Sequence, residues 1–143
     1  MKIHNCLPIL IDCLNRWTTR PTAAQFEAEY VESTRHAAGD FFDDFYDVIE
    51  NLEWDRYRAH ALKIDPAHEE VRLRKNLAAV EQLFGFPLEG EVCLFGSFET
   101  WDGFARFDRG RHRVYLGIDE NFDNGKYIDI LTVHELTHAA RES

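Results

Sequence analysis

Residues 134–138 of the chain read H-E-L-T-H, so His134 and His138 stand four positions apart and Glu135 directly follows the first histidine. Positions i and i+4 lie on the same face of an α-helix. On a helix, the two imidazoles can therefore point at one Zn²⁺ ion, and the carboxylate of Glu135 can reach a water molecule held by that ion. The pattern requires a helix near the end of the sequence and predicts a metal site on it.

The residues around the motif favour a metal site over a chance pattern on a solvated helix. We expect this helix to run from about residue 126 to 141, and between positions 128 and 140 its only acidic or basic residues besides the histidines are Asp129 and Glu135. A glutamate is almost never placed in apolar surroundings without a partner, and a zinc site supplies one. The uncharged neighbours should pack the helix against the domain while the histidines face a cleft; they are Thr132, Val133, Leu136, Thr137, Ala139 and Ala140.

This ligand set predicts hydrolytic chemistry. Two neutral imidazoles leave a zinc ion able to take a third protein ligand and a water molecule, and the metal lowers the pKa of that water towards about 7. Glu135 is then the catalytic base, which accepts a proton from the water and passes it to the leaving amine. We expect a peptidase acting on extended peptides, and residues 111–118 form the strand to which such a peptide could add.

The net charge of the chain limits the classes of molecule that it is expected to bind. The formal net charge is −10, from 16 basic and 26 acidic residues in a chain of 143. An acidic chain without a basic run is a poor candidate for binding nucleic acid or an anionic membrane. No segment approaches the roughly 18 apolar residues of a membrane-spanning helix. We therefore expect a peptide or protein substrate, and neither nucleic acid nor membrane as a partner.

The cysteines and the N-terminal segment indicate a cytoplasmic protein. The three cysteines, Cys6, Cys13 and Cys93, are odd in number, and their spacing matches neither a disulfide framework nor a C-x-x-C zinc site. Reduced thiols in the cytoplasm are the simplest account. The first residues carry one lysine, a very short apolar run and Asp12, which argues against a signal peptide.

The hydrophobic pattern predicts one α+β domain over residues 1–143, with a helical part (1–86) followed by strands and the motif helix (87–143). In the helical part, Thr22 can open a helix, and apolar pairs at helical spacing continue the helical pattern over 41–49. Asp65 followed by proline is a strong signal for the start of a longer helix, which should end at Gly85.

The second part of the chain has strand character. Residues 91–96 form a short, largely apolar run that suits a buried strand, and 104–107 with 112–118 look like a β-hairpin. We expect these strands to form a small antiparallel sheet against which the helical half packs. The C-terminal active-site helix should complete the substrate cleft.

Together, strand residues 114–118, the polar loop after them and the helix 127–140 carrying H-E-L-T-H resemble the strand–loop–active-site-helix unit of zincin metallopeptidases. More narrowly, they resemble bacterial predicted zinc-dependent proteases of the gluzincin type. The resemblance covers about residues 90–143. It implies that His134 and His138 bind zinc and that Glu135 is the catalytic base. It also implies a third ligand, usually a glutamate, on a helix some twenty or more residues downstream.

The chain departs from this family pattern because it has no later helix. Glu142 is the only downstream carboxylate, and eight residues of helix separate it from His134 by about 12 Å, too far to share one ion. Either the chain is an N-terminal fragment of a longer protease, with the third ligand beyond residue 143, or the ligand lies upstream. We favour the fragment.

The upstream candidates for the third ligand are Cys93, Glu99, Asp102 and His112. Cys93 precedes His134 by 41 residues, a spacing similar to that of the cysteine ligand in peptide deformylases. The chain lacks the Gly-rich first motif and the rest of the cysteine motif of that family, and a cysteine in an apolar strand is more often a buried structural residue. A second functional interpretation also stays open: a catalytically silent zincin-like module that binds peptides or regulates a partner.

Overall fold

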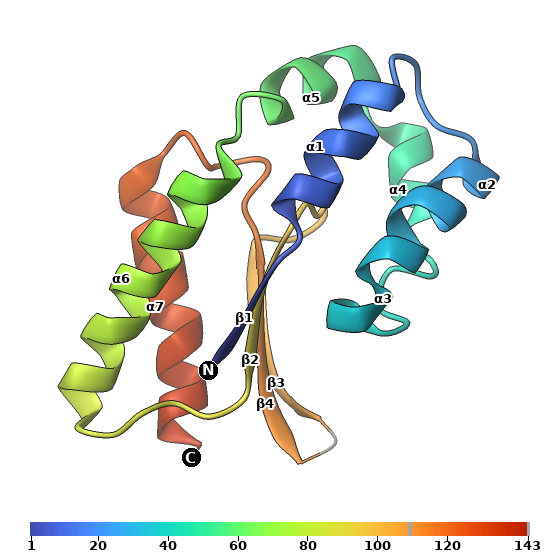
Figure 1. Ribbon diagram of the computed structural model, residues 1–143. Coiled ribbons are helices and arrows are strands. Elements are labelled where there is room, and N and C mark those ends of the chain that lie inside the picture. Colours follow the sequence, from blue (N-terminus) through green and yellow to red (C-terminus); the bar gives the residue numbers. More distant parts are fainter. Residues whose placement is uncertain (109, 143) are drawn as a thin grey trace.

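The computed structural model describes residues 1–108 and 110–142 and confirms an α+β fold. A four-stranded sheet lies between two layers of helices (Figure 1). Its strands are β1 (Lys2–Asn5), β2 (Glu91–Phe95), β3 (Gly103–Asp108) and β4 (Arg111–Gly117), in the spatial order β1-β2-β4-β3.

The sheet is mixed, so the expectation of an antiparallel sheet was wrong in this respect. The β3–β4 hairpin is antiparallel, as predicted, but β1, β2 and β4 run parallel to one another. The difference arises from two parallel pairings between segments distant in the sequence: β2 pairs with β4, and β1 pairs with β2, which sets Ile3 opposite Val92. A strand of four residues inside a helix-rich region carries too short a pattern to be recognised, and parallel strands require a long connection between them. The connection between β1 and β2 contains helices α1 to α6.

One layer is built from the helices of the first part of the chain. They are α1 (Leu7–Arg16), α2 (Ala23–Phe26), the π-helical turn η1 (Glu27–Val31), α3 (Glu32–Ala38), α4 (Tyr46–Asn51) and α5 (Trp54–Ala61). Thr22 opens α2 through a capping box with Gln25, because each side chain bonds the other residue's backbone N–H. The helical pattern over 41–49 is only partly realised, since residues 39–45 form turns before α4 begins.

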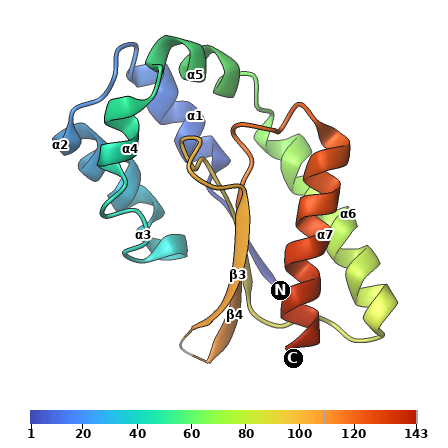
Figure 2. The ribbon, with the colours of Figure 1, turned by 180° about the vertical axis from the view of Figure 1, so that it is seen from behind.

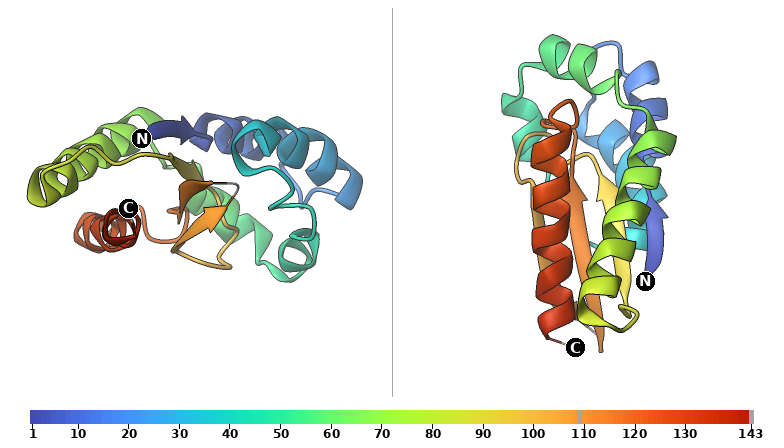
Figure 3. Two further views of the ribbon diagram at one scale, coloured as in Figure 1. Left: turned by 90° about the horizontal axis from the view of Figure 1, so that it is seen from below. Right: turned by 90° about the vertical axis from the view of Figure 1, so that its left-hand side faces the viewer.

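The other layer consists of α6 (Pro66–Phe84) and α7 (Gly125–Arg141), which pack against each other (Figure 3). The predicted ends of α6 are confirmed. The Asp65 side chain accepts hydrogen bonds from the N–H groups of Ala67 and His68, and Gly85 ends the helix in the left-handed conformation with φ +80°. Within the described residues, no helix is both long enough and apolar enough to cross a membrane.

Alternate residues of each strand serve the two layers, as the period of a strand requires. One face contacts the first layer of helices. There the Cys93 thiol donates to the Ala37 carbonyl, the Phe95 ring packs against Phe42, and the Tyr115 ring packs against Phe41. On the opposite face, Gly103 of β3 lies against Leu131 and Glu135 of α7. Figure 2 shows the same division, with β3 and β4 between α3 and α7. A side chain on a strand can therefore contact only one of the two helix layers.

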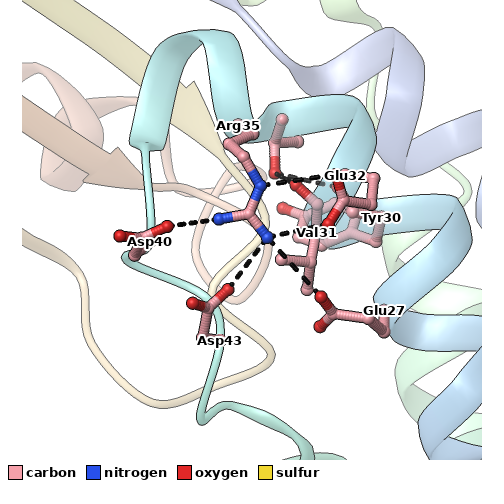
Figure 4. A network of polar contacts seen from close by, with 8 residues as sticks. Glu27, Tyr30, Val31, Glu32, Arg35, Asp40 and Asp43 are labelled. Atoms are coloured by element: carbon pink, nitrogen blue, oxygen red, sulfur yellow. Dashed lines mark hydrogen bonds and ion pairs between the residues drawn. The ribbon is translucent and has the colours of Figure 1, made fainter.

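A charged network joins α3 to the turns that follow it. The Arg35 guanidinium is paired with Glu27, Glu32, Asp40 and Asp43 (Figure 4). These carboxylates raise the pKa of Arg35 above its ordinary value, and the largest cause is the hydrogen bond that Arg35 donates to Glu32. The network ties the turn-rich segment 39–45 to α3. That segment carries the aromatic rings of Phe41 and Phe42, which contact the sheet.

A buried carboxylate connects three parts of the fold at the other end of the sheet. Asp119, 1% exposed, accepts hydrogen bonds from the backbone N–H groups of Ser97 and Phe98, from the Ser97 hydroxyl and from the Tyr57 hydroxyl. Phe98 and Glu99 both have positive φ, a conformation that costs free energy for residues other than glycine. The bonds to Asp119 hold this strained loop between β2 and β3 in place.

We predict that Tyr57→Phe lowers the free energy of unfolding by about 1–3 kcal/mol, because the buried Asp119 Oδ2 loses one of its two donors. Asp119→Ala should cost more, since it leaves two buried backbone N–H groups without partners. Urea denaturation followed by circular dichroism measures both values. The control is Tyr46→Phe, whose half-buried hydroxyl donates to the Pro21 carbonyl alone. If Tyr57→Phe costs no more than this control, the assigned role of Asp119 is wrong.

Candidate metal centre

The orientation of α7 decides where the motif points. The Asn124 side chain caps the helix by accepting a hydrogen bond from the Tyr127 N–H. The residues that pack α7 against the domain are Ile128, Thr132, Leu136, Ala139 and Ala140, all buried. Four of the six residues expected to do this are buried, whereas Thr137 is half-buried and Val133 is 36% exposed. Both histidines lie on the exposed side of the helix.

The two imidazoles converge on one point in space. His134 Nε2 and His138 Nε2 are 3.2 Å apart, with ring centroids separated by 4.6 Å and ring planes at 89°. A tetrahedral zinc ion with Zn–N distances of about 2.0–2.1 Å holds two nitrogen ligands about 3.3 Å apart. The observed separation of the two nitrogens therefore fits two ligands of one tetrahedral ion. The i, i+4 geometry that the sequence predicted for this pair is present in the structure.

Glu135 lies beside this point but on the buried side of the helix. It is 7% exposed, and its Oε1 is 3.9 Å from His134 Nε2. Its side chain lies over Gly103, where a Cβ would come within 3.3 Å of Glu135 Cγ. The sequence analysis did not single out Gly103, although a glycine inside a strand often marks a close approach of another element. Glycine at this position lets the carboxylate side chain pack against the edge strand.

A third protein ligand is not present in the part of the chain that the structure describes. No group of three or more His, Cys, Asp or Glu side chains there could hold a metal ion. Cys93 faces the helix layer opposite to α7, where its Sγ donates to the Ala37 carbonyl at 3.7 Å. Its burial raises the pKa of the thiol well above the ordinary value, which disfavours the thiolate form that binds metals. Cys93 is therefore a buried structural residue, and its position does not fit a deformylase-like ligand set.

The other upstream candidates have their own partners away from the histidine pair. Asp102 accepts hydrogen bonds from the Tyr127 hydroxyl at the start of α7 and from Asn121. Glu99 is ion-paired with Arg56 at 3.9 Å. The His112 ring contacts that of Phe107 with centroids 4.9 Å apart.

The downstream carboxylate is placed as the sequence predicted. The helix runs unbroken to Arg141, and Glu142 continues the backbone hydrogen bonding by donating its N–H to the His138 carbonyl. Glu142 therefore lies two helical turns from His134, about 12 Å along the axis. It does not complete a site with the two histidines.

The strand proposed as the docking edge needs correction. β4 lies inside the sheet, between β2 and β3, so both of its hydrogen-bonding edges are used. In the described part of the chain β3 pairs with β4 alone and forms the edge beside α7. The sequence of the hairpin does not reveal which of its two strands lies at the edge of the sheet. The position of the edge depends on which strand pairs with β2, a segment outside the hairpin.

A cleft of about 820 Å³ opens at the C-terminal end of α7. Glu142, one helical turn after His138, lines it together with Phe107 and His112 of the hairpin. The opposite wall comes from the α6–β2 connection and includes Phe86 and Pro87. The cleft mixes aromatic surface with charged groups, and neither His134 nor His138 lines it.

Comparisons of the chain with protein-family models, with curated protein sequences and with solved structures found no match.

We predict that Cys93→Ala leaves zinc affinity unchanged within about two-fold, because the sulfur lies on the opposite face of the sheet from α7. In the same titration against a chromophoric chelator, His138→Ala should weaken binding by more than about ten-fold, since it removes a ligand. Cys93→Ala should also lower the free energy of unfolding by about 1 kcal/mol through loss of buried contacts. A large loss of zinc affinity in Cys93→Ala would reinstate the sulfur as a ligand.

Proposed function

We propose that the chain carries the zinc-binding histidines and the catalytic base of a zinc-dependent peptidase of the zincin type, and that it resembles the bacterial gluzincin-like proteases. The observation that carries the proposal is the pair of imidazole nitrogens 3.2 Å apart with the Glu135 carboxylate beside them. In this proposal Zn²⁺ is the cofactor, His134 and His138 hold it, and a peptide or protein is the substrate. The protein would act in the cytoplasm.

Each residue has a distinct task. His134 and His138 donate nitrogen lone pairs as neutral imidazoles, since a protonated ring has none to give. When bound, a zinc ion supplies Lewis acidity, which lowers the pKa of water and polarises a carbonyl group. Glu135 does not bind the metal, and Oε1 is the oxygen on the histidine side of its carboxylate. Glu135 accepts the proton of the attacking water there and delivers it to the amine of the cleaved bond.

The burial of Glu135 supports this role. The carboxylate has little access to bulk water, and the Glu135 side chain packs beside Gly103 of the edge strand, which limits its movement. A base that is fixed near its proton donor loses less entropy on reaction than a mobile one. The neighbouring histidines, by contrast, are open to solvent, so that substrate and water can reach them.

The substrate would lie along β3. An extended peptide can add to an unpaired strand edge through backbone hydrogen bonds, and β3 is the edge strand beside α7. Running from Gly103 towards Phe107, such a peptide would reach the cleft at the end of α7. The aromatic surface of Phe86 and Phe107 would then receive a substrate side chain.

The cysteines agree with a cytoplasmic location. All three cysteines are buried, and each has a free thiol. Burial raises the pKa of the Cys6 thiol to about 12 and that of Cys13 to about 11. Thiols with such high pKa values react slowly with oxidants.

A second candidate function is a catalytically silent module that binds peptides along the same edge. The observation that favours it is the lack of a third ligand among the described residues. Two imidazoles alone bind zinc more weakly than a complete set of three, so this chain could retain the groove while binding metal poorly.

Zinc content and peptide cleavage, measured together, separate the two functions. We predict that the chain binds zinc, that His134→Ala abolishes this binding, and that Glu135→Gln keeps zinc but reduces cleavage of a mixed peptide library by at least about 100-fold, the effect of losing a general base. Products are identified by mass spectrometry.

His68→Ala is the matched control, because His68 is also exposed on a helix but lies on α6 and has no histidine partner at i+4. It should change neither zinc binding nor cleavage. A chain that binds zinc but cleaves no peptide would support the silent module. A chain that binds no zinc, even at neutral pH with the metal added, would contradict both the metal site and the peptidase.

A further inference from the structure

The net charge of the chain conceals a basic surface on the β3–β4 hairpin. Residues 103–117 contain four arginines and one aspartate, a formal charge of +3 in a chain whose net charge is −10. The period of a strand places Arg106, Arg111 and Arg113 on one face, the face opposite to α7. In Figure 2 the lower parts of β3 and β4 extend beyond α3. The proposed hydrolysis uses none of these arginines.

Two of these arginines lie directly opposite each other in the sheet. Arg106 of β3 and Arg113 of β4 are register partners, and like charges in this arrangement destabilise a sheet. The same row continues through Glu91 of β2 to Lys2 of β1. Glu91 lies 3.3 Å from Arg113 and 3.6 Å from Arg111, so one carboxylate serves two guanidinium groups. A row of three cations and one carboxylate is suited to an anionic ligand.

Arg106 is the member of this row that lies on the edge strand. Its side chain is exposed, and β3 is the strand along which the substrate would lie. The guanidinium carbon lies over the Tyr115 ring, 5.3 Å from the centroid, and Nη2 donates to the Tyr115 hydroxyl at 3.4 Å. A guanidinium carries its N–H donors in a planar fork that matches a carboxylate. The contact with Tyr115 sets the position of this fork at the edge of the sheet.

We propose that the peptidase recognises an acidic side chain of its substrate, Asp or Glu, through Arg106, with Arg113 adding positive charge beside it. The proposal rests on the proposed function, because it uses the substrate path along β3. A carboxylate bound there offsets the repulsion between the two opposed arginines. The net charge of −10 repels an acidic peptide in general, so the preference should be confined to the substrate position next to this pair.

The alternation of an extended peptide determines which of its residues meets Arg106. Side chains of a peptide paired with β3 point alternately to the two faces of the sheet. Gly103 lies against Glu135 on the α7 face, and Arg106 is three residues further along the strand on the opposite face. The acidic residue would therefore stand three positions from the one beside Gly103, about 10 Å along the peptide. Its two neighbours would point to the α7 face, as Ala105 and Phe107 do.

Cleavage of a peptide series by the zinc-loaded chain tests the proposal. The peptides share one neutral sequence with an amidated C-terminus and differ in the position of a single Glu, and each has a matched Gln peptide. We expect kcat/KM to rise at least about five-fold for Glu at one position, about two to four residues from the cleaved bond, and to change less than about two-fold at the positions next to it. Because the ends are blocked, the preference cannot come from a terminal carboxylate. Added salt should reduce it.

Substitutions of Arg106 identify the group that recognises the acidic side chain. Arg106→Gln should abolish the preference for Glu over Gln, and Arg106→Glu should replace it with a preference for Lys, while both variants still bind zinc and cleave the neutral peptide. Arg74→Gln is the matched control, because the Arg74 side chain is 62% exposed on α6 and is also paired with a carboxylate, that of Glu70. It should keep the preference. Circular dichroism confirms that each variant is folded.

Peptide binding gives a second measurement that does not depend on turnover. In the chain carrying Glu135→Gln, the fluorescence anisotropy of a labelled peptide reports its affinity. The peptide with Glu at the favoured position should bind at least about five-fold more tightly than its Gln counterpart. Adding Arg106→Gln to the same chain should remove this difference.

The outcomes distinguish this proposal from the proposed function. Cleavage without a preference for Glu, or a preference that survives Arg106→Gln, overturns the acidic subsite and leaves the peptidase standing. Binding of the Glu peptide that depends on Arg106, without cleavage of any peptide, supports the subsite and contradicts the peptidase. A chain that neither binds nor cleaves these peptides overturns both. A single-stranded DNA oligonucleotide that binds as tightly as the Glu peptide also overturns the proposal, because the arginines would then recognise phosphate.

Discussion

The packing of one side of α7 is the constraint on which the candidate site depends. Thr132, Leu136 and Ala139 fix the rotation of the helix by burying one side against the sheet and α6. The helical period then directs His134 and His138 outward together. Glu135, one position further on, turns back towards Gly103 of the edge strand. A rotation of the helix by one residue, about 100°, would bury a histidine or expose the carboxylate.

Features encoded within a few neighbouring residues could be predicted from the sequence. The start of α6 at Asp65, its end at Gly85 and the hairpin are set by local conformational preferences and turns, and the structure contains all three. The convergence of the two imidazoles belongs to the same class, because the spacing of four residues fixes it once the helix forms. The α+β class follows from the order of these elements.

Features that depend on distant partners could not be predicted. β1 is a strand because β2, nearly ninety residues later, offers it an edge, and its own four residues contain no comparable signal. A second parallel pairing, between β2 and β4, places β4 inside the sheet and leaves β3 as the edge. The face on which Cys93 lies follows from strand register, since a shift of one residue would move its sulfur to the α7 side.

The proposed peptidase requires that the Nε2 atoms of His134 and His138 bind the same ion. The most direct measurement is an anomalous difference map, collected at the zinc absorption edge from crystals grown with the metal. The account predicts one strong peak at about 2.0–2.1 Å from both nitrogens, the distance of a zinc–imidazole bond. A map with no peak between these two side chains, or with zinc bound only elsewhere on the chain, would contradict it.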